Sequence, residues 1–298
     1  MAKHVQSVRH LGMFLPDGSL TIAQCATLAC LLEATAPKPG NVHRSADFED
    51  LCFADFVVSA AAVGPAIGNA EHQGVGAAIL EAIRATRAFV PTNTNLGCVL
   101  LMAPLAAVPR SQSLQHGIPD VIQGLTHSDA KMVYEAIRMA APGGLGQADE
   151  MDVRDDPPNS LVDAMRLAAG RDFVARQYAN NFFEVLSCVT PWLVDARNMG
   201  WPMTTAIIHT HIRLMADFPD SLIARKCGEQ VAQESSARAK HVLASGDPDT
   251  ATYQQALHDF DFWLRCDGHR RNPGTSADLI AAGLFAALRD SMLVSPFR

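Results

Sequence analysis

Three short polar loops hold most of the side chains that could do chemistry, and each is followed by an apolar, helix-forming segment. The loops cover residues 37–44, 92–95 and 272–276. Because the first backbone N–H groups of a helix have no partner inside it, a helix start attracts anions. The first loop also carries the basic side chains of Lys38, His43 and Arg44. These features favour phosphate binding, although ordinary turn and capping chemistry would explain the same residue types without a ligand.

Two carboxylates flank these loops. Glu33 is expected in the last turn of the helix that ends before Pro37, where a negative charge opposes the helix dipole. A nearby cation would help to explain its presence there. Asp278 is expected in the first turn of the last helix, where an acid simply complements the dipole. Each could be a catalytic carboxylate or a magnesium ligand, and the sequence alone does not separate these roles.

The segment between residues 142 and 159 predicts no regular structure and is acidic. Its carboxylates are Asp149, Glu150, Asp152, Asp155 and Asp156. Since carboxylate and phosphate oxygens hold Mg²⁺, one hypothesis is a metal site that includes Asp152, and the other is a solvated acidic loop. The glycines at 143, 144 and 146 resemble a phosphate-binding loop only weakly, because they follow no predicted strand.

Nearly all of the chain has the apolar periodicity of helices. Thr21 and Gln24 form a capping-box pattern in front of the first helix. Helices are predicted over residues 22–36, 47–64, 75–89, 96–108, 128–140, 161–168, 172–188, 204–216, 220–244, 250–264 and 275–289. Thr275 or Ser276 is the expected cap of the last one. With no alternating strands, no repeat and no dividing linker, residues 1–298 predict a single all-α domain without a substantial sheet.

Composition narrows the class of protein. The net charge of −7 argues against a nucleic-acid partner, and 48% hydrophobic residues exclude a disordered chain. Residues 1–15 lack the apolar core of a signal peptide, and the longest apolar run, 96–108, is too short to cross a membrane. The seven cysteines are odd in number and include no C-x-x-C pair, which favours reduced thiols in the cytoplasm. His209 and His211, two apart on a predicted helix, do not form a metal pair.

Four segments, in order along the chain, resemble motifs of the triphosphoribosyl-dephospho-CoA synthase family. They are residues 33–44 with Pro37-Lys38-Pro39-Gly40, residues 92–97 with Thr92-Asn93-Thr94, residues 220–226, and residues 272–279 with Ser276-Ala277-Asp278-Leu279. The resemblance implies an all-helical fold and a transferase. In that reaction the ribose 2′-hydroxyl of 3′-dephospho-CoA attacks the anomeric ribose carbon of ATP and adenine leaves. The product belongs to prosthetic-group or cofactor biosynthesis.

The resemblance also implies roles for individual residues. Glu33 and Asp278 would be catalytic, and Asp152 would contribute to a Mg²⁺ site. The nucleotide-binding residues would be Lys38, Asn41, His43, Arg44, Asn93, Thr94, Asn95, Asp172, Arg225, Thr275 and Ser276. Because each polar loop would contact the nucleotide, the loops at Lys38, Asn93 and Ser276 are expected to converge on one cleft. ATP would be a substrate, the partners would be small nucleotides, and a homo-oligomer is left open.

Two departures from the citrate-lyase type of the family leave the acceptor open. Asn95-Leu96 stands where that type has His-Lys, so one expected cation is missing. Around residue 170 the chain is more similar to the archaeal-type branch, and Asp172, Arg176 and Tyr178 are the candidate substitutes there. The two resulting hypotheses are an active transferase, with dephospho-CoA or a related acceptor, and a non-catalytic nucleotide-binding or assembly protein with the same fold.

Overall fold

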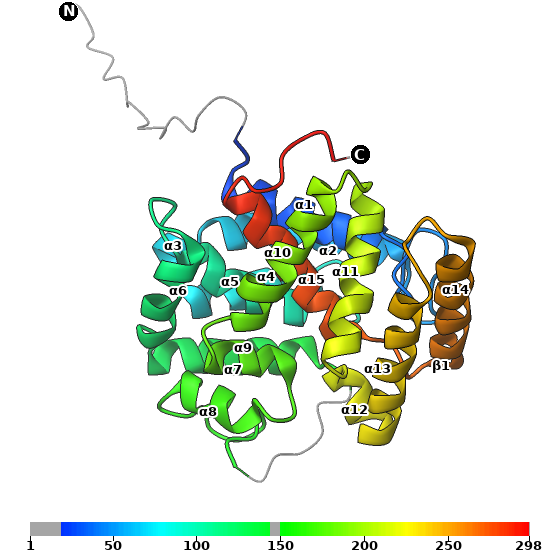
Figure 1. Cartoon of the computed structure of the whole chain (residues 1–298). Coiled ribbons are helices and arrows are strands. Elements are labelled where there is room, and N and C mark those ends of the chain that lie inside the picture. Colours follow the sequence, from blue (N-terminus) through cyan, green and yellow to red (C-terminus); the bar gives the residue numbers. More distant parts are fainter. Residues whose placement is uncertain (1–18, 144–149, 298) are drawn as a thin grey trace, which may run out of the picture.

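The computed structural model describes residues 19–143 and 150–297, and within these ranges the chain is almost entirely helical (Figure 1). The elements are α1 (Ile22–Thr35), α2 (Phe53–Gly68), α3 (Ala70–Gln73), α4 (Val75–Arg87), α5 (Leu96–Ala107), α6 (Leu114–Gln123), α7 (His127–Ala140), α8 (Leu161–Ala168), α9 (Phe173–Ala179), the π-helix η1 (Val185–Val189), α10 (Thr190–Asn198), α11 (Met203–Asp217), α12 (Ser221–Cys227), α13 (Glu229–Ala244), α14 (Ala251–Arg265), the short extended segment β1 (Cys266–His269) and α15 (Gly274–Arg289). Helices make up 67% of the structure and no sheet forms in the described part, so the prediction of an all-α fold is confirmed.

The first helix begins and ends where the sequence predicts. The Thr21 hydroxyl accepts a hydrogen bond from the Gln24 N–H at 3.1 Å, and the Gln24 side chain accepts one from the Thr21 N–H at 2.8 Å. This reciprocal capping box satisfies two N–H groups at the start of the helix. Because Pro37 disfavours the helical conformation of its neighbour, α1 stops at Thr35. Glu33 therefore lies in the last turn, as expected.

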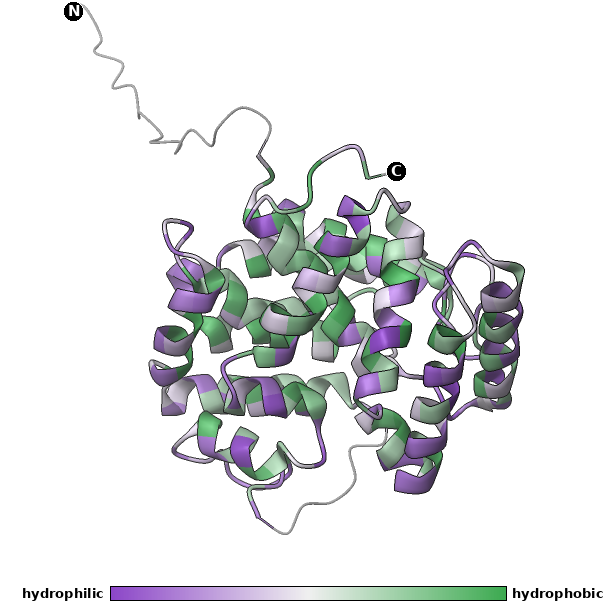
Figure 2. Ribbon diagram, in the orientation of Figure 1, coloured by the Kyte–Doolittle hydropathy of each residue, from purple (hydrophilic) through white to green (hydrophobic). Residues whose placement is uncertain are grey.

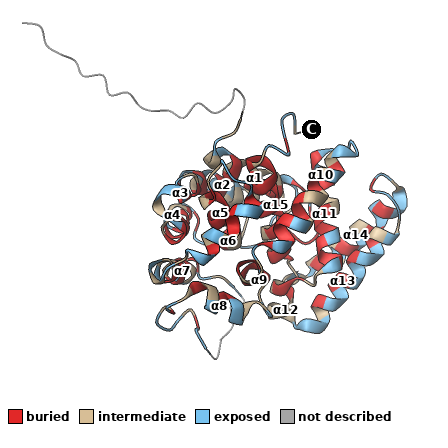
Figure 3. Ribbon diagram, turned by 60° about the vertical axis from the view of Figure 1, so that its left-hand side comes forward, coloured by how far each residue is buried: buried red, intermediate tan, exposed pale blue. Residues whose placement is uncertain are grey.

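Helix α15 is the central element. All of its residues from Leu279 to Arg289 are buried, and α1, α5, α11 and η1 pack around it. Figure 3 shows the buried residues in red on these inner helices, with exposed residues on the outer faces of α13 and α14. A Cβ on Gly283 would lie 2.4 Å from the Val189 side chain, so this glycine allows α15 and η1 to pack closely. Because α15 is held on all sides, the side chains on its N-terminal turns are held in place as well.

The apolar side chains form two clusters. The larger surrounds α1, α2, α4, α5 and α15, and the smaller lies among α11 to α14, where Tyr253 and Phe260 are its largest members. Ile208 on α11 packs against both clusters. Hydrophilic residues gather on the outer helices in Figure 2, α13 and α14 among them. The stretch of α11 near Ile208 therefore joins the two parts of the core.

Several predicted boundaries are wrong for identifiable reasons. The helix expected over 47–64 runs from Phe53 to Gly68 with Pro65 inside it. There, a Cβ on Gly64 would come within 2.4 Å of the Thr27 hydroxyl, so α1 and α2 are in very close contact and their packing sustains the helix. Helix α6 is not among the predicted helices, because Gly117 and Pro119 interrupt its pattern.

Two of the predicted helices are divided. Residues 172–188 give α9 and η1, separated by Asn181 and Phe182 with left-handed φ angles of 56° and 61°. Residues 220–244 give α12 and α13, separated by Gly228 with φ 93°. Glycine adopts this conformation without steric cost, which explains the second break.

The remaining predictions concern the N-terminal segment, the glycine-rich loop, membrane spans and the cysteines. The expected absence of a signal peptide in residues 1–15, the glycines at 144 and 146, and Asp149 lie outside the described residues. Within the described ranges, none of the helices combines the length and the apolar character that a membrane span needs. All seven cysteines are free thiols, as expected.

Candidate active site

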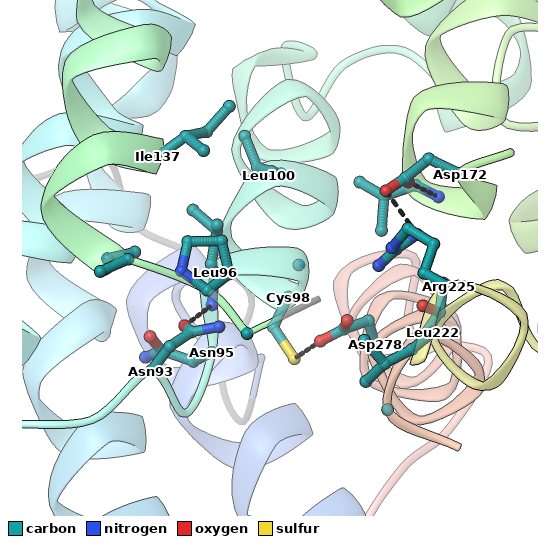
Figure 4. Close-up of a pocket in the computed structure, with 18 of the residues that line it drawn as sticks. Asn93, Asn95, Leu96, Cys98, Leu100, Ile137, Asp172, Leu222, Arg225 and Asp278 are labelled. Carbon is teal, nitrogen blue, oxygen red and sulfur yellow. Dashed lines mark hydrogen bonds and ion pairs between the residues drawn. The ribbon is translucent and has the colours of Figure 1, made fainter. Parts of the chain in front are cut away.

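One cavity of about 570 Å³ lies where the three polar loops meet (Figure 4). Its wall is built from the N-terminal ends of α5, α9 and α15, from the last turn of α1, and from α12. Asn41 from the first loop, Asn93 to Asn95 from the second, and Thr275 from the third all border it. The expectation that these loops converge on one cleft is therefore confirmed.

Direct hydrogen bonds tie the first loop to the segments on either side of β1. The Gly40 N–H donates to Asp261 at 2.7 Å, and the Asn41 side-chain amide donates to the Asn272 side-chain oxygen at 2.7 Å. Gly40 has φ 73°, and a Cβ there would come within 2.9 Å of the Pro273 ring. Only glycine allows this close approach in that conformation, which gives a physical reason for the glycine that follows Pro39.

Side-chain hydrogen bonds hold the second loop in front of α5. Asn93 accepts a hydrogen bond from the first N–H of the helix at 3.1 Å. The Thr94 hydroxyl lies 2.6 Å from that of Ser59, and the buried Asn95 donates to the Thr86 hydroxyl at 3.1 Å. The loop is thus fixed before any ligand binds.

Asp278 faces the cavity from the second turn of α15, not the first turn that the sequence suggested, because the helix begins at Gly274. Its carboxylate accepts a hydrogen bond from the Cys98 thiol at 3.1 Å (Figure 4). Burial raises the pKa of Asp278 to about 7, the thiol hydrogen bond opposes this shift, and the negative charge of Glu33 adds to it. A carboxyl group with such a pKa can exchange a proton near neutral pH.

Gly97, in the first turn of α5, makes room for this carboxylate. A Cβ built on Gly97 would lie 2.0 Å from Oδ2 of Asp278 and 2.3 Å from its Cγ. No side chain larger than hydrogen fits between the start of α5 and α15 at this point. The position of Asp278 therefore depends on a glycine 181 positions earlier in the chain.

Asp220 organises the starts of two helices. Its Oδ1 accepts the N–H groups of Leu222 and Ile223 at 2.8 and 3.0 Å, and its Oδ2 accepts the N–H and hydroxyl of Ser276 at 2.7 and 2.8 Å. Asp220, and neither Thr275 nor Ser276, therefore supplies the capping oxygen at the start of α15. Burial raises the pKa of Asp220, and these hydrogen bonds oppose the shift. Ser276, expected to bind nucleotide, is fully buried and does not line the cavity.

A basic wall lies beside this network. Arg225 forms an ion pair with Asp172 at 2.8 Å, and Asp172 also caps α9 through the N–H groups of its first turn (Figure 4). Both residues border the cavity, and so do Arg171 and Lys226. Asp172 and Arg225, both predicted to bind nucleotide, therefore lie at the cavity together with two cations that were not predicted there, Arg171 and Lys226. Lys226 is the last residue of the third family-like segment, residues 220–226, and this is the signal that could have identified it.

Lys38 is not the exposed loop lysine that the sequence suggested. It is fully buried, and its ammonium lies 2.7 Å from the Glu33 carboxylate, with the main-chain carbonyls of Glu33 and Ala36 as further acceptors. Glu33 borders the cavity, whereas Lys38 does not. The cation expected near Glu33, because of its place at a helix C-terminus, is therefore Lys38 itself.

His43 and Arg44 lie outside the cavity wall. The His43 ring accepts a hydrogen bond from the Ser45 N–H at 3.3 Å, and burial lowers its pKa. Arg44 is exposed. Two of the candidate substitutes near residue 170 are also elsewhere, since Arg176 pairs with the buried Glu184 at 2.9 Å and the Tyr178 hydroxyl donates to the Leu100 carbonyl at 2.6 Å.

Asp152 is buried and borders the cavity on the loop between α7 and α8. Arg154 donates to its carboxylate through the main-chain N–H and through Nε and Nη2 of the guanidinium group, at 2.8 to 2.9 Å. Among residues 19–143 and 150–297, no cluster of three or more His, Cys, Asp or Glu side chains has the geometry of a metal site. A metal ion at this cavity would thus need oxygen ligands from the substrate as well.

Other residues of the wall also had no sequence signal. Arg87 at the end of α4 and His269 of β1 border the cavity, and Tyr134 on α7 does so while donating to the Met151 carbonyl at 2.8 Å. The stretch formed by α7, α8 and α9 is largely apolar, with Ile137 and Met165 among its members. One cavity therefore offers carboxylates, cations and an apolar surface together.

Comparisons with known proteins identify the family of this chain. A family model described as ATP:dephospho-CoA triphosphoribosyl transferase matches residues 19–296. A protein of Malonomonas rubra, named "Probable 2-(5''-triphosphoribosyl)-3'-dephosphocoenzyme-A synthase", is 25% identical over 284 residues, which cover 87% of this chain and 84% of that protein. A crystal structure from Archaeoglobus fulgidus, described as that of a "putative triphosphoribosyl-dephospho-coA synthase", has the same fold with a TM-score of 0.61 at 22% identity, and the match covers 79% of this chain and 99% of that one. Since the family model spans almost the whole chain, this protein belongs to the ATP:dephospho-CoA triphosphoribosyl transferase family.

Proposed function

We propose that the cavity binds ATP and 3′-dephospho-CoA side by side and that Asp278 and Glu33 act on the transfer of the triphosphoribosyl group. The observation that carries this proposal is Asp278, a carboxyl group with a pKa of about 7 on the wall of a cavity that it shares with Glu33 and with four cations. A group of this kind suits a reaction that must take up a proton from a hydroxyl group at neutral pH.

In the proposed reaction, the ribose 2′-hydroxyl of dephospho-CoA attacks the anomeric carbon of the ATP ribose. The new C–O bond forms as the bond from that carbon to N9 of adenine breaks, and adenine leaves with the electron pair. Asp278, in its ionised form, accepts the hydroxyl proton. The leaving adenine needs one proton, so the net change moves a proton from hydroxyl to adenine, and a group of pKa near 7 can both accept and return it.

Glu33 is proposed to stabilise the positive charge that develops on the ribose carbon. Carboxylates do this in glycoside hydrolysis, where the transition state resembles an oxocarbenium ion. Glu33 borders the same cavity as Asp278, and its charge acts on the Asp278 carboxyl. The two carboxylates therefore belong to one electrostatic unit.

The phosphate groups are proposed to bind along the basic wall. Arg171, Arg225 and Lys226 supply cations there, and Arg87 supplies another on the side of α4. Asn41, Asn93, Thr94, Asn95 and Thr275 supply hydrogen-bonding groups at the loops. Lys38, His43, Arg44 and Ser276 are left out of this contact set because they do not reach the wall. The apolar surface on α7 to α9 suits the pantetheine arm of the acceptor.

The residues present fit a magnesium ion. Glu33 offers an oxygen ligand at the cavity wall, and phosphate oxygens of the substrates would supply the further ligands. When bound, the ion would neutralise phosphate charge between the two nucleotides. Asp152, already held by Arg154, is assigned to the wall and to ordering its loop.

We also propose that the chain acts as one domain in the cytoplasm. Ile208 links the two apolar clusters, and the cavity draws on residues from α1 to α15, so no smaller part would be complete. All seven cysteines are free, as a reducing compartment requires.

The test is release of adenine, measured by chromatography, when the protein is mixed with ATP, Mg²⁺ and 3′-dephospho-CoA. The wild type should release one adenine per triphosphoribosyl-dephospho-CoA formed. Asp278→Asn keeps the size of the side chain and should slow turnover by about 10²- to 10⁴-fold while it still binds ATP. ATP binding without adenine release from the wild type would refute the transferase reaction with this acceptor.

A further inference from the structure

The ammonium group of Lys38 has no N–H left to offer a substrate. Its three acceptors are the Glu33 carboxylate, the Glu33 carbonyl and the Ala36 carbonyl, and they match the three protons that an ammonium can donate. The side chain is fully buried, while Glu33 is only partly so and borders the cavity. The pair therefore points one way, with the cation inside and the carboxylate towards the cavity.

The backbone around Lys38 is equally constrained. Its own N–H donates to the Ala36 carbonyl at 2.7 Å, and its carbonyl accepts the Asn41 N–H at 3.2 Å. Pro37 and Pro39 restrict the backbone on both sides of Lys38, and only a glycine fits at position 40 beside the Pro273 ring. Turning the ammonium towards a phosphate would break the ion pair and the hydrogen bonds to both carbonyls.

His211 adds no second positive charge beside Lys38. His211 on α11 lies near enough for the charge of Lys38 to act on it, and it is fully buried. Burial, and then the charge of Lys38, keep the pKa of His211 well below its ordinary value, so its ring is neutral. Among the described residues, Glu33 is the one carboxylate at ion-pair distance from Lys38.

We propose that Lys38 is a positioning residue for the transferase reaction, whose buried ammonium fixes the Glu33 carboxylate at the cavity wall and does not contact the nucleotide. This rests on the role of Glu33 in the proposed function. An ion pair made before the substrate binds costs no reorganisation during the reaction. It also leaves the phosphates to Arg171, Arg225 and Lys226.

The experiment compares two lysines by the same substitution. Lys38→Met and Lys226→Met each replace an ammonium with an apolar group of similar length, one inside and one on the cavity wall. ATP affinity is measured by calorimetry with Mg²⁺, and kcat by adenine release at saturating substrates. Lys38→Met should lower kcat by about a hundredfold and leave the Kd for ATP within about threefold, because a carboxylate misplaced by 1 Å can cost that much in rate. Lys226→Met should instead weaken ATP binding by about tenfold or more. A Lys38→Met variant that loses ATP affinity as Lys226→Met does, with kcat unchanged, overturns the proposal.

Each single variant leaves one member of the ion pair without its partner: Lys38→Met leaves the Glu33 carboxylate, and Glu33→Gln leaves the buried Lys38 ammonium with neutral acceptors only. Melting temperatures are therefore measured for every variant, and Glu33→Gln is also compared with Glu33→Gln/Lys38→Met, which carries neither charge of the pair. If Lys38 acts only through Glu33, the two should have the same kcat and the same Kd for ATP within about twofold. A further tenfold loss in either quantity on removing Lys38 would assign it a direct contact and refute the inference.

Failure of the inference differs from failure of the proposed function. A wild type that releases no adenine contradicts the function. A Glu33→Gln variant as fast as the wild type removes Glu33 from catalysis and with it the role of Lys38. A slow Glu33→Gln variant beside a fully active Lys38→Met variant contradicts the positioning role alone.

Discussion

Gly97 provides a sharp test of the geometry, because it is at the point where α5 approaches Asp278. In Gly97→Ala, the new Cβ would be 2.0 Å from Oδ2 and 2.3 Å from Cγ of Asp278. Since Cβ atoms essentially never approach within 3.0 Å of another heavy atom, the carboxylate must move by about 1 Å. A shift of that size at a reacting group can cost about a hundredfold in rate.

Stability should respond very differently to this substitution. The atoms that must move are at the end of a side chain, and alanine in place of glycine within a helix contributes about 0.5–1 kcal/mol. We therefore expect Gly97→Ala to have nearly the wild-type melting temperature while kcat for adenine release falls about a hundredfold. Gly170→Ala is the matched control, since a Cβ at Gly170 meets nothing within 4 Å. It should leave both quantities unchanged.

The route of the effect can also be tested. If Gly97→Ala acts by moving Asp278, it should add little to the loss already caused by Asp278→Asn, so the double variant should be about as slow as Asp278→Asn alone. A Gly97→Ala variant with wild-type kcat would show that the position of this carboxylate does not limit turnover. A large loss in the Asp278→Asn background would show that Gly97 acts through another contact, such as the start of α5.

Three further outcomes follow from the charges of the site. The kcat/KM of the wild type should rise with pH through about 7, because Asp278 acts in its ionised form and kcat/KM follows the pKa of the free protein, and this limb should be absent in Asp278→Asn. The stability of the fold should change with pH in the opposite direction. The folded state holds the Asp278 proton up to about pH 7, whereas the unfolded chain loses it near pH 3.8, so the free energy of unfolding falls as pH rises between these values. Asp278→Asn should therefore have a higher melting temperature than the wild type at pH 8 and no such gain at pH 4. Asp220→Ala, which removes the caps of α12 and α15, should lower the free energy of unfolding in urea by about 2–4 kcal/mol, against about 1 kcal/mol for Thr250→Ala at the single cap of α14.

Local physics explains how much of the fold the sequence could predict. The helices of the larger core follow from apolar periodicity, and the start and end of α1 follow from Thr21, Gln24 and Pro37. Where the predicted helix boundaries are wrong, contacts between distant parts of the chain determine the local structure. Pro65 is tolerated because Gly64 allows α2 to pack tightly on α1, and the break between α9 and η1 depends on two non-glycine residues in left-handed conformation, Asn181 and Phe182. Neither effect has a local signature.

The site was predictable to the extent that it lies on helix ends. Asn41, Asn93 and Thr275 come from the polar loops, and the convergence of these loops was expected. Lys38 was predicted to bind phosphate because of its position in a polar loop. Glu33, a carboxylate at a helix C-terminus, already indicated that a cation lies nearby, and that cation is Lys38. Arg171 and Lys226 were missed because only the folded chain brings α12 to the start of α9, although the family-like segment 220–226 ends at Lys226.

The ends of the helices suggest how an acidic chain holds two polyphosphate substrates. The short helices α9 and α12 begin with Asp172 and Asp220, whose carboxylates already satisfy their first N–H groups. Helix α5 has no charged cap, because the neutral Asn93 side chain accepts its first N–H, and its start lies at the cavity. Helix α15 also begins at the cavity, but there the Asp220 carboxylate accepts the Ser276 N–H. Since a long helix carries roughly half a positive charge at its start, α5 adds to the basic wall without raising the net charge of the protein. The phosphates should therefore bind between the basic wall and the start of α5, next to Gly97 and Asp278, which is where the proposed transfer takes place.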